Sequence, residues 1–269
     1  MVKYYPLDKI IKQGTTYETP PDRFYIIKRI GTDGSTDTKL VIGGVETGAI
    51  ISEVAPLHRT SSNLLGPLDL GSLYYVVPPN TKFWVDGPSG AKMRIIGQIG
   101  VLGVGEAMPG EHQARYNAQG KHYKTYLSDS YSLGTDVTWT DGTEYDVLVH
   151  TPKTIERVIL NSYVGASITG DTVSEGDFAV EFYMDNTPFE PEFAENLYAG
   201  IDALSMPSPP RDDTEELVFT LKDYPIVVNG DHTLSIRVRN VSGSDKAPAS
   251  GSSWTVNVKV IAKYERVGS

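Results

Sequence analysis

The fold is decided by Trp254-Thr-Val-Asn-Val-Lys-Val260, in which apolar and polar residues alternate. Alternation of this kind is typical of a β-strand with one buried face, because successive side chains of a strand point to opposite sides of the sheet. Thr233-Leu-Ser-Ile-Arg-Val-Arg239 repeats the pattern a short distance upstream. The last part of the chain is therefore predicted to contain two half-buried strands.

The same alternation extends through most of the sequence and predicts an all-β fold. Gly, Pro, Asn and Asp residues separate the alternating segments, and these residue types supply the backbone angles that tight turns need. Many short strands at this spacing favour two antiparallel β-sandwich or jelly-roll-like domains with little helix. Further strands are predicted at residues 24–30, 39–42, 48–54, 73–77, 81–86, 91–102, 145–149, 158–160, 178–184 and 217–221.

Four segments describe the expected organisation of the 269 residues. Residues 1–22 are interpreted as an N-terminal arm, and residues 23–110 as a β-sandwich that serves docking or assembly. Residues 111–134 form a polar linker without a pattern, and residues 135–269 form the jelly-roll-like C-terminal domain. Within that last domain, residues 185–213 are a proline-rich insertion that includes one candidate short helix at 192–198. Long insertions in compact domains often make a contact or form a lid, although a plain surface excursion fits equally well.

Composition and charge narrow the classes of function. The chain has no cysteine, so disulfides and thiolate chemistry are excluded, and it suits folding in a reducing cytoplasm. We find no pattern of a signal peptide and expect no membrane span. Residues 1–110 contain 11 basic and 10 acidic residues, whereas residues 111–269 contain 13 and 24. This balance argues against nucleic-acid binding, which needs clustered Lys and Arg.

The search for catalytic chemistry finds no motif. Nucleophile elbows, phosphate-binding loops and zinc-binding helices are absent, so no catalytic residue, cofactor or metal ligand is predicted. His112 and His122 are near neighbours in the linker, where solvated histidines are expected more often than a metal site. The acidic cluster at residues 212–216 is most simply a solvated loop, with calcium binding or glycan hydrolysis as weaker alternatives.

The three tryptophans leave a choice between core and binding surface. Trp84 and Trp254 lie in alternating strands, and Trp139 precedes a turn. Large aromatic side chains contribute most when they are packed, so burial of two of the three is expected. If Trp139 were the exposed one, it would be a possible ligand contact for sugar rings.

Residues 24–102 also carry a resemblance to a group of known proteins. The segments concerned are Ala55-Pro-Leu-His-Arg-Thr60, Leu65-Gly-Pro-Leu-Asp-Leu70, Tyr74-Tyr-Val-Val-Pro-Pro-Asn80 and Gly90-Ala-Lys-Met-Arg-Ile-Ile-Gly97. Together they resemble structural proteins of bacterial and archaeal viruses. The resemblance implies a coat subunit or a capsid-decorating or spike-like protein, folded and assembled in the host cytoplasm and located in the virion. Its partners would be further copies of itself and other virion proteins.

We therefore expect a protein that works by assembly and not by catalysis. The predicted assembly contacts are apolar residues of the N-terminal arm, namely Tyr4, Tyr5, Leu7, Ile10 and Ile11. An ordinary first strand or helix of the front domain is an equally good interpretation of this segment. The alternative functions are a carbohydrate-binding or adhesion module that recognises a surface glycan and, third, a β-sandwich glycan hydrolase.

Overall fold

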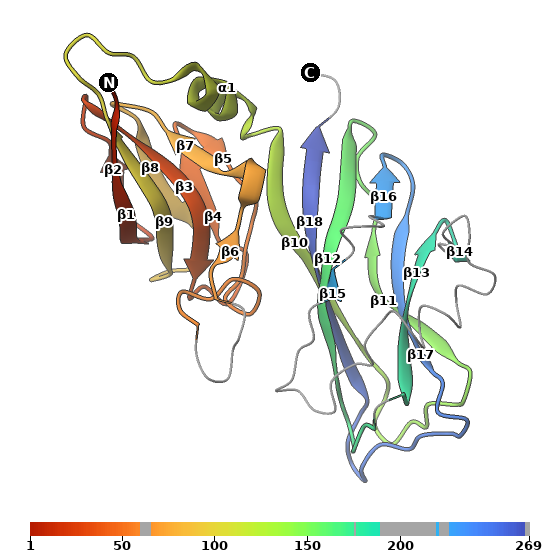
Figure 1. The fold of residues 1–269 in the computed structure, drawn as a ribbon. Coiled ribbons are helices and arrows are strands. Elements are labelled where there is room, and N and C mark those ends of the chain that lie inside the picture. Colours follow the sequence, from red (N-terminus) through yellow and green to blue (C-terminus); the bar gives the residue numbers. More distant parts are fainter. Residues whose placement is uncertain (60–65, 175, 189–218, 221–225, 267–269) are drawn as a thin grey trace. The chain divides into compact units, whose positions relative to one another are not determined.

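The computed structural model describes residues 1–59, 66–174, 176–188, 219–220 and 226–266, with the side chains of 161–167 and 219–220 left aside. It confirms the all-β prediction, since the described chain forms four antiparallel sheets and one α-helix (Figure 1). Two compact units divide the chain, residues 1–126 and residues 127–269, and each is described by itself.

The first unit contains two antiparallel sheets. One has the strand order β1-β9-β3-β6, with β7 also paired to β3, and the other has the order β2-β8-β4-β5. A 3-10 turn, η1, spans Gly71–Leu73. The strands are β1 (Lys3–Lys12), β2 (Tyr17–Glu18), β3 (Arg23–Thr32), β4 (Lys39–Ile42), β5 (Val45–Glu46), β6 (Leu68–Asp69), β7 (Tyr75–Val77), β8 (Lys82–Asp86) and β9 (Lys92–Val101).

Alternation along these strands produces the core of the first unit. On β9, Met93 and Ile95 are fully buried, whereas Lys92 is exposed and Arg94 is half-buried. Helix α1 (Gly110–Ala118) is followed by Gln119, whose side-chain amide bonds both the amide and the carbonyl group of Val76 on β7. This pairing satisfies buried polar groups on both sides and fixes the end of the helix to the sheet.

The second unit is also built from two sheets, with the orders β10-β18-β12-β15, where β16 also pairs with β12, and β11-β17-β13-β14. Trp254, Val256, Val258 and Val260 are all buried in its core, as the alternation of the sequence predicts. The strands are β10 (His122–Ser132), β11 (Glu144–His150), β12 (Glu156–Thr169), β13 (Phe178–Met184), β14 (Thr187–Pro188), β15 (Phe219–Thr220), β16 (Ile226–Asn229), β17 (Leu234–Asn240) and β18 (Thr255–Arg266).

The structure corrects three local expectations. Residues 111–134 are not an unpatterned linker, because they contain most of α1 and all of β10, and the division between the units falls after Tyr126. Residues 48–54 form turns and one isolated bridge between Ile50 and Thr38 instead of a strand. Here Gly48 lies so close to the carbonyl group of Lys124 that a Cβ atom would be 1.8 Å from its oxygen.

The third correction concerns the N-terminal arm. Residues 3–12 form β1, which pairs with β9 along its whole length from Lys3 opposite Val101 to Lys12 opposite Lys92. The segment is therefore the first strand of the front unit, the other role that its sequence allows. Most of the proline-rich insertion, with its candidate helix, lies outside the described residues. Among the described residues, no helix has the length and hydropathy needed to cross a bilayer.

Candidate functional site

A β-bulge in β3 creates the most distinctive surface feature of the first unit. Ile27 lies opposite Gly97 and Arg29 lies opposite Ile96, so Lys28 is an extra residue without a partner on β9. A bulge breaks the alternation of sides along a strand. Lys28 and Arg29 are consequently both exposed although they are consecutive.

Gly97 makes this bulge sterically feasible. A Cβ atom at residue 97 would lie 1.9 Å from the carbonyl oxygen of Ile26, far inside van der Waals contact. Only a glycine allows the two backbones to approach this closely. The polar pair Lys28-Arg29 inside an otherwise apolar run, Phe24 to Ile30, is the sequence signal for the irregularity.

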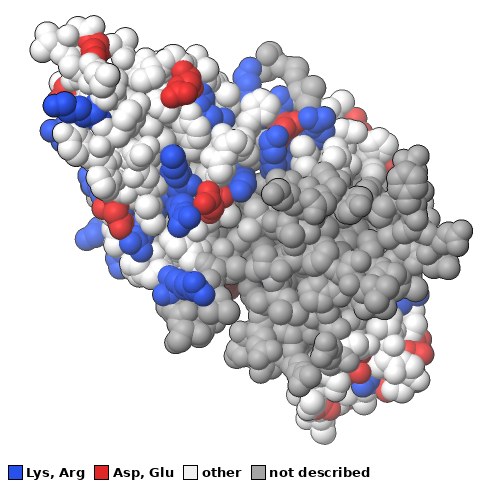
Figure 2. Space-filling model, viewed as in Figure 1, with Lys and Arg blue, Asp and Glu red and all other residues white. Residues whose placement is uncertain are grey.

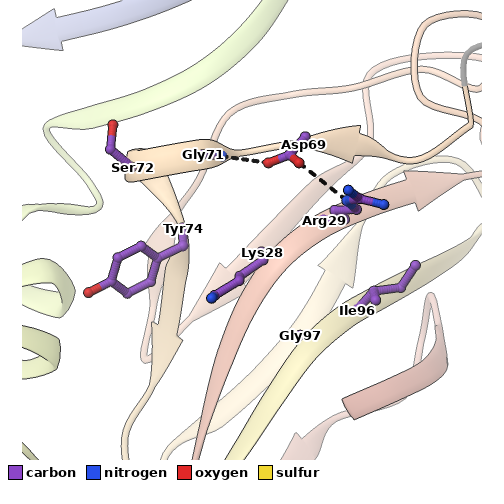
Figure 3. Close-up of a pocket in the computed structure, with 8 residues that line it drawn as sticks. All are labelled: Lys28, Arg29, Asp69, Gly71, Ser72, Tyr74, Ile96 and Gly97. Atoms are coloured by element: carbon purple, nitrogen blue, oxygen red, sulfur yellow. Dashed lines mark hydrogen bonds and ion pairs between the residues drawn. The ribbon is translucent and has the colours of Figure 1, made fainter. Parts of the chain in front are cut away.

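The bulge borders a hollow of about 580 Å³ on the outer side of the sheet. The residues around it come from three segments, 28–29, 69–74 and 96–97. Figure 3 shows Lys28 directed toward Tyr74, with Ile96 on the neighbouring strand β9. Its lining combines two cations, a carboxylate, a hydroxyl group, an aromatic ring and an aliphatic side chain. The lining residues are Lys28, Arg29, Asp69, Gly71, Ser72, Tyr74, Ile96 and Gly97.

Charges in the hollow are only partly compensated. Arg29 Nε lies 3.3 Å from Asp69 Oδ2, and the other oxygen of Asp69 accepts a hydrogen bond from the Gly71 amide at 2.8 Å (Figure 3). Lys28 forms no ion pair within the described part of the chain. Among the described residues, Lys28 is therefore a positive charge in the hollow without a carboxylate partner, a feature suited to an anionic group of a partner.

Helix α1 holds the aromatic wall of the hollow. The hydroxyl group of Tyr74 is 3.1 Å from His112 Nδ1, and Arg115 donates a hydrogen bond of 2.6 Å to the carbonyl group of Tyr74. Burial raises the pKa of Tyr74 and lowers the pKa of His112, so both groups are neutral near pH 7. This neutral pair fixes Tyr74 without adding charge to the site.

Beside the hollow, β1 and β9 present exposed and half-buried side chains on one face. Asp8 lies opposite Ile96 and Ile10 lies opposite Arg94, so the four side chains share this face. Arg94 and Asp8 form an ion pair of 2.7 Å, and the side chain of Ile10 is 42% exposed. The surface thus mixes aliphatic side chains with charges that are mostly paired.

The predicted assembly contacts divide between surface and core. Tyr4, Tyr5 and Ile10 are exposed, but Leu7 and Ile11 are 4% and 0% exposed. The expectation that Leu7 and Ile11 meet a neighbouring molecule is corrected, because they face the core of their own unit. The sequence does not indicate that Leu7 and Ile11 are core residues. Only two positions of the ten-residue strand are buried, so no alternating pattern is visible.

Trp139 is buried and is therefore not the ligand contact considered from the sequence. It is 0% exposed, its ring centroid lies 4.7 Å from that of Phe178, and its Nε1 donates to the carbonyl group of Thr143. Trp254 is also buried, whereas Trp84 is half-buried, so the expectation that two of the three tryptophans are in the core is confirmed. A sugar-binding platform that includes Trp139 is excluded by this burial.

A second group of charged residues lies on β11, β13 and β17. Arg237 contacts Glu144 at 2.9 Å, and Arg239 contacts Glu144 at 2.6 Å and Glu181 at 3.0 Å. Tyr183 donates a hydrogen bond of 2.9 Å to Glu144. Each of these carboxylates is thus compensated by a guanidinium group, as buried charges generally require. The arrangement fits cross-strand stabilisation of this sheet better than acid–base chemistry.

Two other expectations from the sequence have different outcomes. His112 belongs to α1, is 7% exposed and lies with its ring centroid 5.5 Å from that of Phe24, so it is not a solvated loop histidine. The acidic cluster at 212–216 lies outside the described residues. Within the described ranges, no group of three or more His, Asp or Glu residues is placed to hold a metal ion.

Comparisons with known proteins return only remote likenesses. No model of a known family matches the chain, and no curated protein matches it. Among solved structures, the major capsid protein P2 of bacteriophage PM2 is 12% identical, with 98% of both chains covered and a TM-score of 0.35. The turret protein A223 of Sulfolobus turreted icosahedral virus is 12% identical over 100% of both chains, with a TM-score of 0.19.

A third similar structure belongs to a different class. The plant receptor-like kinase ANX2 is 8% identical, with 97% of this chain and 83% of that chain covered and a TM-score of 0.27. At scores this low, none of the three likenesses assigns a function. The class that the fold itself defines is an all-β protein with two antiparallel, sandwich-like units.

Proposed function

We propose that the protein is a structural component of a virus particle, a coat subunit or a capsid-decorating or spike-like protein, that acts by assembly and not by catalysis. The virion location and the other virion proteins as partners come from the sequence resemblance of residues 24–102. The assembly role has independent support in the surface of the first unit.

The observation that carries the assembly role is a group of exposed side chains on one face of β1, β9 and β3. Ile10 and Ile96 lie there beside the ion pairs Asp8–Arg94 and Arg29–Asp69. Aliphatic side chains surrounded by paired charges are typical of protein–protein interfaces, where the apolar part supplies affinity and the charges supply specificity. A contact that buries Ile10 and the exposed part of Ile96 would remove apolar surface from water, which favours association.

The edge of the same sheet shows how assembly can be limited to this face. β1 is an edge strand, and open edges invite pairing with strands of other chains. Pro6 interrupts the row of amides on β1, and Lys3, Lys9 and Lys12 add charge along it. Uncontrolled edge pairing is thereby discouraged, so the sheet face is the surface that we expect to meet partners.

The test is the mass of the full chain in solution, measured by light scattering over a range of protein concentrations. Assembly predicts a mass above that of the monomer, and Ile10→Ser should shift it toward the monomer because it removes an exposed aliphatic group from the contact face. Val104→Ser is the matched control, since Val104 is also exposed and apolar but lies in a loop of the same unit. A chain that stays monomeric at all concentrations contradicts the proposal.

A further inference from the structure

The two units carry opposite net charges. Residues 1–126 contain 14 Lys and Arg against 11 Asp and Glu, a net charge of +3, whereas residues 127–269 contain 10 against 23, a net charge of −13. The difference in net charge between the two parts is larger when the chain is divided at the boundary between the units than when it is divided after residue 110. Figure 2 shows Lys and Arg side chains spread over the visible face of the first unit, with fewer carboxylates between them.

Exposed aspartates gather at one end of the second unit. Asp245 Oδ1 accepts a hydrogen bond from the Asp141 amide, and the Gly251 amide donates to Asp136, so the loops before β11 and before β18 lie together (Figure 1). The amide of Ala249 donates to the carbonyl group of Gly170, which brings Asp171 to the same end.

These aspartates remain uncompensated. Asp136, Asp141, Asp171 and Asp245 are all exposed, and none of them forms an ion pair with a described residue. Their side chains bond only backbone amides, which shape the loops and leave the negative charges in place. We name these four residues the acidic loop end.

The hollow on the first unit has the opposite properties. Lys28, which has no ion-pair partner among the described residues, is exposed by the bulge, Arg29 lies next to it, and Ser72 and Tyr74 also line the hollow. A carboxylate that enters this hollow gains an ion pair with Lys28. The charged parts of the two units are therefore complementary in sign.

We propose that the hollow around Lys28 binds the acidic loop end of another copy of this chain. The inference rests on the proposed function, for which it names the partner surface. Such a contact joins two different surfaces, so repetition produces a ring if the rotation between copies closes and an open chain of copies if it does not. The attraction is electrostatic and partly exposed to solvent. Added salt should therefore weaken it, because a rising ionic strength shortens the Debye length from about 30 Å to about 3 Å.

The experiment follows the association of the full chain by sedimentation velocity at low and at high salt. Lys28→Glu should weaken association at low salt roughly tenfold and reduce its dependence on salt, because it replaces the attraction by a repulsion. Lys82→Glu is the matched control: it changes the net charge of the same unit by the same amount at an exposed site on β8, away from the hollow. Thermal unfolding of both variants checks that each one remains folded.

Variants of the second unit test the other partner of the contact. Asp141→Asn together with Asp245→Asn should weaken association, since the amide oxygens keep the loop hydrogen bonds while the charges are lost. Asp231→Asn is the control at the opposite end of the same unit, in the turn before β17. A chain carrying both Lys28→Glu and Asp245→Lys should recover association, because the exchanged charges attract again.

The outcomes separate this inference from the function on which it rests. Association of the wild type that Lys28→Glu weakens and the exchanged pair restores supports the inference. Association that responds equally to Lys28→Glu and Lys82→Glu overturns the inference and leaves the assembly role standing. A wild-type chain that is monomeric at every salt and protein concentration overturns both.

Discussion

Arg94 Nη2 donates a hydrogen bond of 2.7 Å to Asp8 Oδ2, and the two residues are 86 positions apart in the sequence. Arg94 Nε bonds the other oxygen of the same carboxylate at 2.9 Å, so the contact is bidentate. Bidentate pairs between guanidinium and carboxylate groups have the best-defined geometry of all ion pairs. This pair joins the edge strand β1 to β9 on the face that we assign to assembly.

The Asp8–Arg94 pair makes stability depend on acid pH. The hydrogen bond from Arg94 lowers the pKa of Asp8 below its ordinary value of 3.8, so the folded state binds a proton less readily than the unfolded state. The stabilisation is therefore present above pH 3.8 and is lost as the pH falls through the folded pKa. Because Asp8 is half exposed, we expect Asp8→Asn to cost on the order of 0.5 kcal/mol at pH 7 and almost nothing at strongly acid pH.

Urea unfolding of the wild type and Asp8→Asn at both pH values measures this difference. Arg94→Gln and the double variant complete a mutant cycle that isolates the pair from other effects of each change. A coupling free energy that is unchanged between neutral and strongly acid pH contradicts the assignment.

Gly97→Ala should destabilise the first unit severely. The new Cβ atom would collide with the carbonyl oxygen of Ile26, so either the bulge at Lys28 or the pairing of β3 with β9 must shift. We expect a loss of about 2–4 kcal/mol in the free energy of unfolding, measured by urea denaturation. Gly110→Ala is the matched control: a Cβ atom there meets nothing within 4 Å, and alanine favours the first turn of α1. Equal effects of the two changes would falsify the steric account of the bulge.

Trp139 is expected to matter for stability and not for ligand binding. Trp139→Ala removes a fully buried ring and should lower the free energy of unfolding by about 3–5 kcal/mol. Trp139→Phe keeps most of the volume but removes the indole donor to the carbonyl group of Thr143, which still accepts a hydrogen bond from the backbone amide of Asn240, so the cost should be about 0.5–1.5 kcal/mol. Trp84→Phe, at a half-buried position, should cost less than either change. Denaturant unfolding ranks the three variants, and a neutral Trp139→Ala would contradict the core assignment.

His112 should add a second pH dependence nearer to neutrality. Burial lowers its pKa below the ordinary value of 6.5, and the nearby carboxylate of Glu111 opposes this shift. The unfolded state therefore takes up a proton first as the pH falls below 6.5, and stability declines until the folded histidine is also protonated. His112→Gln should flatten the part of the stability profile between neutral pH and mildly acid pH. The measurement is the midpoint of urea unfolding at a series of pH values, and an unchanged profile in the variant contradicts this origin.

Much of the fold could be predicted from alternation alone. The strands at 39–42 and 178–184 have the predicted bounds, and those around Val85 and Ile95 begin and end within one residue of their predicted positions. The strand around Val258 begins one residue later and ends six residues later than predicted. These strands bury one face completely, so apolar residues recur at every second position and indicate a strand. The candidate site was less predictable, because the bulge at Lys28 depends on pairing with Gly97, a contact that local sequence does not show.

The elements that the sequence did not predict share a physical cause. β1 buries only Leu7 and Ile11, and β10 is mostly half-exposed, so neither strand has the apolar period of a fully covered strand. Helix α1 also buries little and contacts the sheet through polar side chains such as Arg115 and Gln119. Contacts with distant parts of the chain stabilise these strands and this helix. Their local sequences alone therefore do not predict them.

The order of strands in the first sheet has a consequence for how the chain folds. β9 lies between β1 and β3, and it pairs with both over nearly its whole length. During synthesis, β1 emerges first but cannot join the sheet until residues 92–101 have followed. Until that insertion, Leu7 and Ile11 have no core to enter, and closure of the sheet is a long-range event of the kind that slows folding. The sheet of the first unit should therefore form only after residues 92–101 have been synthesised. Until then the N-terminal strand remains unpaired and is available to chaperones and to aggregation.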